Sequence, residues 1–416
     1  MRVCVFGLWH LGTVTAACLA SLGHEVAGLD PNEETVARLE NGEPPLYEPG
    51  LADLVVQGLQ RGALRFTTDA PTALDGARVL WVTFDTPVDE DDRANAGFVV
   101  ERIESLFDHL AGGTLVLVSS QLPAGSVAQL EASYAARGRP ERVMFAASPE
   151  NLRLGKAIDA FLKPDRIIVG ARTDEARRVV SELLEPLRAA IEWMSVESAE
   201  MTKHALNAFL ATSVAFINEI AGVCERVGAD ARDVARGLKT DARIGPRAYL
   251  SPGGAFAGGT LARDITFLTA LAGDGVPLIE SVKTSNDRHR NWTRVRLLSI
   301  LGGVKDRSIA VWGLTYKPGT DTLRRSGAVE LCRWLTAQGA RVRAHDPAVK
   351  RLPDEGIATL CSSASEAVSG ADALVIATEW PEYRTESVPA GIVVIDANRF
   401  IGAREGVRYY SVGAAS

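Results

Sequence analysis

Residues 7–12 of the chain, which read GLWHLG, could form a turn that binds the pyrophosphate of a dinucleotide. The first glycine of such a turn permits the tight bend, the second lets the backbone approach the phosphates, and the third lets the following helix pack closely on the strand. Gly7 and Gly12 fill the first and third positions, but Trp9 stands at the second. Asp30 follows the next expected strand, where an acid binds ribose hydroxyls and favours NAD over NADP. The turn alone leaves two interpretations open: an NAD site, or a strand–helix turn that binds nothing and whose pocket Trp9 fills.

This turn belongs to a pattern of short apolar runs that alternate with segments of helical period. The runs near the N-terminus are rich in β-branched residues and cover 2–8, 25–30, 79–84, 114–120 and 166–172. Such alternation predicts a parallel sheet with helices on both faces. A second unit of this kind begins near residue 307, where 339–347 (GARVRAHDP) repeats the layout of 23–31 (GHEVAGLDP). We interpret the two ends as an internal repeat of one nucleotide-binding fold.

The middle of the chain has a different pattern. Residues 197–228 lack proline and have no glycine before Gly222, which predicts one long helix or two in line. Apolar residues surround much of its circumference, so we expect burial between domains or between subunits. The predicted fold is α/β, with two Rossmann-like doubly wound parallel-sheet domains joined by a central helical domain with a long helix. The expected domains are 1–196, 197–300 and 301–416.

The composition narrows the class of protein. The 416 residues are 46% hydrophobic and 23% charged, which is typical of a globular protein, and the net charge of −7 argues against nucleic acid or an anionic membrane as the main partner. We expect no signal peptide and no membrane span. Five scattered cysteines lack the spacing of a metal site or a disulfide framework. We therefore expect reduced thiols, no metal and a cytoplasmic protein.

Several longer segments resemble one known family when they are taken together with the turn. They are NGEPPLYEPGL (41–51), SPENLRLGKAIDAFLKPDRIIVG (148–170), AEMTKHALNAFLATSVAFINEI (199–220), RIGPRAYLSPGGAFAGGTLARD (243–264), GLTYKPGTDTLRRS (313–326) and ALVIATEWPEYR (373–384). In order, spacing and domain plan, the chain resembles the UDP-glucose/GDP-mannose dehydrogenase family over essentially its whole length. The resemblance implies oxidation of the C6 alcohol of a nucleotide sugar to a carboxylate, with two NAD. It implies a base for the first hydride transfer. For the second, it implies a cysteine thiolate that adds to the aldehyde, followed by hydrolysis of a thioester.

The resemblance also implies roles for individual residues. Glu150 matches the family's conserved acid, and Lys203 and Asn207 match the pair that steadies the oxyanion. A cation and an amide donor one helical turn apart lie on the same face of a helix, as that task requires. Asp264 matches an acid that assists proton transfer through water. The implied cofactor contacts are Gly7, Trp9, His10, Leu11, Gly12, Asp30, Thr83 and Gln121. The implied substrate contacts are Glu150, Asn151, Leu152, Arg153, Lys203, Asn207, Arg247, Tyr249, Gly258, Lys317 and Arg324.

Four positions depart from the family's pattern, and all of them fall where the cofactor and the reacting groups are expected. Thr260 stands at the position of the nucleophilic cysteine, and a threonine hydroxyl is a much poorer nucleophile than a thiolate unless a base activates it. Gln121 replaces a threonine and Asn151 replaces an aromatic residue. Trp9, at the second glycine of the turn, is the fourth departure.

Three functions fit these residues. The first is an NAD-dependent nucleotide-sugar dehydrogenase, with a UDP-hexose as substrate by resemblance, whose oxidation stops at the aldehyde or reaches the acid slowly. The second is a redox-neutral, epimerase-like enzyme that retains its NAD and returns the hydride. The third is a homologue that binds a nucleotide sugar without catalysis. The resemblance further implies a homodimer formed through the central helix.

Overall fold

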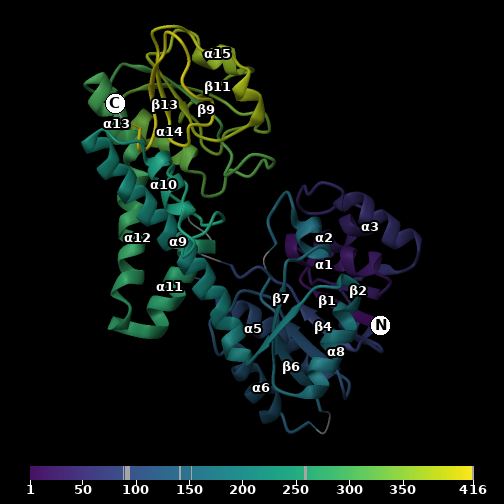
Figure 1. Cartoon of the computed structure of the whole chain (residues 1–416). Coiled ribbons are helices and arrows are strands. Elements are labelled where there is room, and N and C mark those ends of the chain that lie inside the picture. Colours follow the sequence, from purple (N-terminus) through teal and green to yellow (C-terminus); the bar gives the residue numbers. More distant parts are fainter. Residues whose placement is uncertain (88, 90–93, 140–141, 151, 257–259, 415–416) are drawn as a thin grey trace. The chain divides into compact units, whose positions relative to one another are not determined.

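The computed structural model describes the chain except for residues 88, 90–93, 140–141, 151, 257–259 and 415–416. The chain divides into two compact units, Met1–Ala205 and Leu206–Ser416. Each unit contains a sheet of its own. The long helix α9 (Val196–Val227) contributes residues to both units (Figure 1).

The first unit is built on an eight-stranded sheet of order β3-β2-β1-β4-β5-β6-β7-β8. Its strands are β1 (Arg2–Phe6), β2 (Glu25–Leu29), β3 (Leu64–Thr67), β4 (Val79–Val82), β5 (Leu115–Val118), β6 (Met144–Ala147), β7 (Ile167–Ala171) and β8 (Ile191–Met194). Its helices before α9 are α1 (His10–Ser21), α2 (Glu33–Glu40), α3 (Leu51–Gln60), α4 (Ala70–Leu74), α5 (Ala96–Ser105), α6 (Ser126–Ala136), α7 (Ala157–Leu162) and α8 (Asp174–Leu184). The five strands expected here are present, and β3, β6 and β8 are additional.

The prediction of a fully parallel sheet is wrong at one position, because β6 and β7 pair antiparallel. The connection between them contains only α7, a helix of six residues. Such a helix is about 9 Å long, which is too short to carry the chain back along the sheet. The chain therefore re-enters the sheet at the edge where β6 ends, and β7 runs in the opposite direction.

Alternating side chains of each strand divide the core of the first unit into two layers. On β1, Val3 and Val5 pack in the layer covered by α1, α3, α7 and α8, whereas Cys4 and Phe6 pack in the layer covered by α4, α5 and α6. Successive side chains of a strand point to opposite faces, so a strand covered on both faces must be apolar at every position. This explains the continuous apolar runs in the sequence and confirms the helix-covered sheet.

The second unit combines helices with a six-stranded parallel sheet of order β11-β10-β9-β12-β13-β14. Its helices after α9 are α10 (Ala231–Thr240), α11 (Thr260–Ala272), α12 (Pro277–Arg290), α13 (Trp292–Leu301), α14 (Gly327–Ala337) and α15 (Ala364–Val368). Its strands are β9 (Ser308–Trp312), β10 (Arg341–His345), β11 (Thr359–Leu360), β12 (Ala373–Ile376), β13 (Val393–Asp396) and β14 (Arg408–Tyr410). The order of these six strands repeats the order β3-β2-β1-β4-β5-β6 of the first sheet, with β9 in the place of β1. This confirms the internal repeat. The bounds of the three domains expected from the sequence stay a prediction.

Helix α9 is long and apolar enough to cross a membrane by length and composition alone, with a mean hydropathy of 1.4 over its most apolar window. The core helix of a folded protein meets the same criteria. Glu200, His204 and Asn207 of this helix are buried and hydrogen-bonded to protein groups. The absence of a membrane span stays a prediction.

Gly12 is required at its position, because an added Cβ would lie 1.8 Å from the carbonyl oxygen of Gly7. We expect Gly12→Ala to lower the free energy of unfolding of the first unit by about 3 kcal/mol, since the strand and the helix must separate. Gly237 on α10 is the control, because nothing lies within 4 Å of its added Cβ. Gly237→Ala should raise stability by about 0.5 kcal/mol. Thermal unfolding followed by circular dichroism tests both variants, and an unchanged melting temperature for Gly12→Ala would contradict the argument.

Candidate active site

The turn at the end of β1 has the geometry of a dinucleotide site. Gly7 has a φ of +96°, a conformation that favours glycine, and Gly12 packs against its carbonyl. Thr83, at the end of β4, donates its hydroxyl to that same Gly7 carbonyl at 2.9 Å. Helix α1 begins directly after the turn and has no acidic residue in its first turn. Its N-terminal amides and the positive end of its dipole are therefore suited to an anion.

Trp9 is compatible with this turn. Its φ of −72° is an ordinary value for a side chain that carries a Cβ, so the tryptophan does not strain the backbone. The residue is 46% exposed. A side chain this exposed does not fill a buried pocket, which counts against the interpretation of a closed turn. The indole instead lies at the surface beside the start of α1.

Asp30 and its counterpart in the second repeat, Asp346, differ in their remaining acceptor capacity. Asp30 accepts N–H bonds from Leu8 at 2.7 Å and Asn32 at 2.9 Å. Asp346 accepts the corresponding bonds and, in addition, bonds from the Thr315 amide, the Thr315 hydroxyl and the Trp380 indole. A carboxylate oxygen has about two lone-pair positions. Each oxygen of Asp30 accepts one of these bonds and can accept another from a ribose hydroxyl, whereas Oδ2 of Asp346 already accepts four bonds. The first repeat therefore fits NAD.

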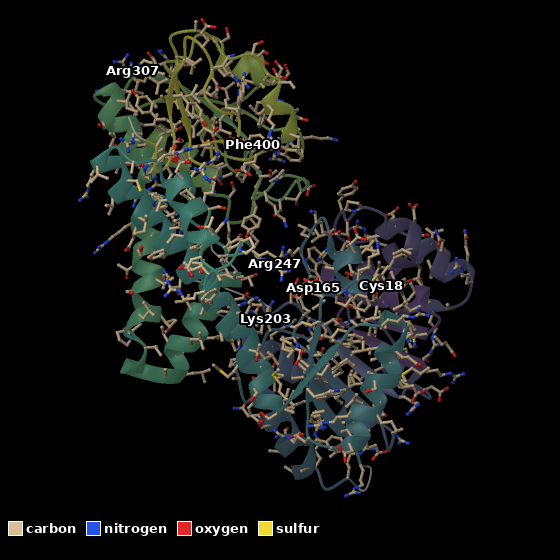
Figure 2. The ribbon with its side chains drawn as sticks, viewed as in Figure 1. Cys18, Asp165, Lys203, Arg247, Arg307 and Phe400 are labelled. Atoms are coloured by element: carbon tan, nitrogen blue, oxygen red, sulfur yellow. The ribbon has the colours of Figure 1, made fainter. Side chains whose placement is uncertain are left out.

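Glu150, Lys203 and Gln121 line one pocket of the first unit, as expected for groups that act together. Figure 2 shows the Lys203 side chain on α9, and its Nζ donates to the backbone oxygen of Glu150 at 2.6 Å. The Glu150 carboxylate accepts a bond from the Leu152 amide. Burial raises the pKa of the Glu150 carboxyl, and the Lys203 ammonium opposes that rise. A carboxyl whose pKa is raised is suited to take up a proton, and the nearby ammonium can stabilise a negative charge.

Further residues of this pocket were not expected from the sequence. Ser120 is buried, and its hydroxyl has no hydrogen-bond partner in the described part of the chain. Glu200 accepts bonds from the Gly125 and Val127 amides at 2.7 and 3.0 Å, and His204 bonds to the Leu122 carbonyl at 2.9 Å. These bonds hold α9 against the segment that carries Gln121. Only the i, i+4 spacing of Glu200 and His204 on the helix could have indicated their common face.

Four other predicted contacts occupy different surroundings. The His10 ring bonds to the buried carboxylate of Glu48 at 3.0 Å. Leu11 and Leu152 line a second, mostly apolar pocket that also reaches Glu150. Arg153 is exposed, and its carbonyl accepts from the Lys156 amide. The direct cofactor and substrate contacts of these side chains stay predictions.

In the second unit, Asn207 donates a hydrogen bond to Asp264, and both side chains are buried. Thr260 is exposed at the first position of α11, one helical turn before Asp264. Asn151 and Gly258, two predicted substrate contacts, lie outside the described residues. The structure thus brings Asn207 and Asp264 together, and their catalytic roles stay predictions.

The segment before Thr260 is held by side chains that bond to its backbone. Asn218 bonds to the Gly253 amide at 3.0 Å and to the Gly254 carbonyl at 3.3 Å. Asn286 bonds to both the amide and the carbonyl of Phe256 at 2.9 Å. His289 bonds to the Gly253 carbonyl at 2.7 Å. These three residues, which we call the loop clamp, were missed because no local pattern marks a side chain that binds a distant backbone.

The segments predicted to grip the nucleotide approach each other in the second unit. Arg247 and Tyr249 are exposed on the segment after α10 (Figure 2 labels Arg247). Lys317 and Arg324 belong to the loop between β9 and α14. Burial raises the pKa of Tyr316, Arg325 opposes that rise, and Tyr249 adds to it. Tyr316 is thus an additional candidate for substrate contact.

All five cysteines lie in the described part of the chain and are buried. Burial raises the pKa of the Cys4, Cys18 and Cys332 thiols to about 12. Cys224 packs in a small core cluster with Val412. No reactive thiolate is therefore available in place of the missing cysteine. Among the described residues, no group of three His, Cys, Asp or Glu side chains could hold a metal.

Three models of the UDP-glucose/GDP-mannose dehydrogenase family match the chain. The NAD binding domain matches residues 1–188, the central domain 197–288 and the UDP binding domain 310–403. These matches agree with NAD as the cofactor.

Individual proteins are similar over nearly the whole chain. A UDP-glucose 6-dehydrogenase of Pseudomonas aeruginosa is 36% identical over 404 residues, which cover 92% of this chain and 89% of that protein. A UDP-glucose 6-dehydrogenase of Bacillus subtilis is 34% identical, with coverage of 99% and 93%. The solved structure of a UDP-glucose dehydrogenase from Pyrobaculum islandicum is 30% identical, with a TM-score of 0.92 and coverage of 100% and 98%.

The stability of the protein should depend on pH through His289 of the loop clamp. Burial lowers the pKa of His289, so its ordinary value of about 6.5 applies only to the unfolded chain. The unfolded state therefore takes up the proton first, and the stabilisation present above pH 6.5 is lost as the pH falls below it. Between pH 7.5 and 5.5, the wild type should lose about 1 kcal/mol more stability than His289→Gln, which can donate but does not titrate. Thermal unfolding at both pH values measures this difference, and equal losses would contradict it.

Proposed function

The chain belongs to the UDP-glucose/GDP-mannose dehydrogenase family, and we propose that it oxidises the C6 alcohol of a UDP-hexose to the aldehyde and stops there. The observation that carries the proposal is a retained Glu150–Lys203 pocket in a chain with Thr260 at the nucleophile's position and no accessible thiol. Support for the substrate comes from the UDP binding domain match and the UDP-glucose dehydrogenases to which the chain is similar.

The first oxidation needs a proton acceptor and a stabilised oxyanion. Bound NAD supplies the hydride acceptor. The raised pKa of Glu150 suits a group that takes a proton near neutral pH, and Lys203 supplies the positive charge that steadies an alkoxide. Asn207, held by Asp264, offers an amide donor for the same task. Ser120 adds a hydroxyl without a described partner in the pocket of Glu150.

The second oxidation needs a different group. In the family, a thiolate adds to the aldehyde so that a hydride can leave from a tetrahedral adduct. Thr260 is exposed, and a hydroxyl of ordinary acidity remains protonated at neutral pH. The aldehyde, or its hydrate, is therefore released, and any acid forms slowly through the hydrate.

A redox-neutral enzyme with retained NAD is a second candidate, and the exposed indole of Trp9 beside the cofactor turn supports it, since an indole there can cover a bound dinucleotide. A nucleotide-sugar-binding protein without catalysis is a third candidate. Cytoplasmic localisation is also part of the proposal, as are the direct ligand contacts expected from the sequence other than that of His10.

Product analysis tests the proposal. The protein is incubated with NAD and a panel of UDP-, GDP-, CDP- and dTDP-sugars, and the products are identified by mass spectrometry. We expect a product two hydrogens lighter than a UDP-hexose and equimolar NADH. Thr260→Cys should also yield the acid, one oxygen heavier than the aldehyde, whereas Thr260→Ser should not. Rapid acid formation by the wild type would contradict the proposal. Binding of a nucleotide sugar without turnover would favour the third candidate. Formation of an isomer without release of NADH would favour the second candidate.

We further propose a homodimer formed through α9. Phe209, Phe216, Val223 and Val227 are all exposed and follow one another at intervals of seven, seven and four residues. This spacing puts them on one face of the helix, and a contiguous apolar face of this kind favours association.

Light scattering after size exclusion should give a dimer mass for the wild type. Phe209→Glu with Phe216→Glu should give the monomer mass, because two carboxylates would be buried without partners. Leu278→Glu on α12 is the control, since Leu278 is exposed and lies on a different helix. A wild-type monomer, or a double variant that stays dimeric, would contradict this interface.

A further inference from the structure

Glu48 is a buried carboxylate that joins three segments of the first unit. Its side chain is 1% exposed. One carboxylate oxygen accepts from the His10 ring at 3.0 Å and from the Gly155 amide at 2.7 Å, and the other accepts from the Ala157 amide at 2.8 Å. A carboxylate buried to this degree is tolerated only when donors surround it, so all three bonds contribute to keeping it in place.

Two of these donors lie at the end of the loop that carries Glu150. Ala157 is the first residue of α7, so Glu48 caps that helix. Gly155 has a φ of +85°, which fixes a tight turn just before the helix. At the other end of the loop, Lys203 holds the Glu150 carbonyl. The loop is therefore held at two points. Lys203 holds it at the Glu150 carbonyl, and Glu48 holds it at the Gly155 and Ala157 amides.

The third donor comes from the cofactor turn. His10 follows Trp9 and is the first residue of α1. Its side chain is 13% exposed, so the ring is largely enclosed beside Glu48. His10 is also one of the groups that act to lower the pKa of the Glu150 carboxyl. The His10 ring thus connects the start of α1, in the cofactor turn, to Glu48, which anchors the loop that carries Glu150.

We propose that His10 and Glu48 form a brace between the cofactor turn and the loop 148–157, and that His10 is a positioning residue that fixes Glu150 through Glu48. The kinetic part of this proposal rests on the proposed function, in which Glu150 takes the proton of the substrate hydroxyl. The structural part does not, because it concerns amides that can be measured without turnover. A link of this kind makes the placement of Glu150 depend on an ordered cofactor turn.

Amide hydrogen exchange of the full-length protein tests the structural part. In His10→Ala, exchange at Gly155, Ala157 and Leu152 should accelerate about tenfold, because a hydrogen bond to a charged group is lost. Leu152 is the decisive amide, since it donates to the Glu150 side chain. If His10 acted only on the start of α7, exchange at the Leu152 amide would keep its wild-type rate. His10→Gln, which keeps an N–H donor, should restore slow exchange, and the exposed His109→Ala is the control.

Turnover and NAD binding test the kinetic part. His10→Ala should lower kcat for NADH formation about tenfold and change the Kd for NAD, measured by calorimetry, less than about twofold. A large rise in Kd with unchanged exchange would show that His10 binds the cofactor directly and would overturn the brace. Wild-type exchange rates at all three amides in His10→Ala would also overturn it. If His10→Ala does not fold, Glu48→Gln should give the same pattern of faster exchange. Absence of wild-type turnover on every sugar would refute the proposed function and leave the exchange result to decide on the brace.

Discussion

A buried carboxylate at the end of the second strand fixes the turn after the first strand in both sheets. Asp30 holds the Leu8 amide and Asp346 holds the Leu314 amide, each at 2.7 Å. The bond sets where the following helix begins and therefore where its N-terminal amides point. In the first repeat, the carboxylate retains free acceptor positions, and the turn suits a dinucleotide. In the second, the Trp380 indole and Thr315 bond to Oδ2 of Asp346, so this oxygen is not available to a ribose hydroxyl. The bonds around this one carboxylate thus distinguish the two repeats.

The features that could be predicted from the sequence are those set by local pattern. Apolar runs identify β1 and β2, and the spacing of Gly7, Gly12 and Asp30 identifies the turn between them. Strand β6 was missed because two of its four residues, MFAA, are alanine, which is depleted in strands, and none is β-branched. Its antiparallel pairing with β7 depends on the length of a connection, which no periodicity reports. Glu150 and Lys203 could be predicted because the family's segments carry them, whereas Ser120 and the loop clamp act through distant backbone groups.

Helix α9 explains why residues of the two units can be adjacent in sequence and yet belong to different clusters. Glu200, Lys203 and His204 bond to loops that follow β5 and β6 in the first unit. Asn207, one turn later, bonds to α11, and Asn218 bonds to the segment before it. A continuous helix fixes the rotation of these side chains about its axis to about 100° per residue. The sequence spacing along α9 is therefore itself a structural constraint on the candidate catalytic groups.

The distribution of altered and retained residues favours changed chemistry over loss of function. Glu150 and Lys203 line one pocket, and the Lys203 ammonium donates to the backbone carbonyl of Glu150, so a carboxyl group and a positive charge remain together, as hydride transfer from an alcohol requires. The loop clamp likewise holds the backbone before Thr260 through Asn218, Asn286 and His289, at the cost of burying their polar side chains. In the proposed reaction the two oxidations depend on different groups, so a threonine at residue 260 would remove the second oxidation and leave the requirements of the first in place.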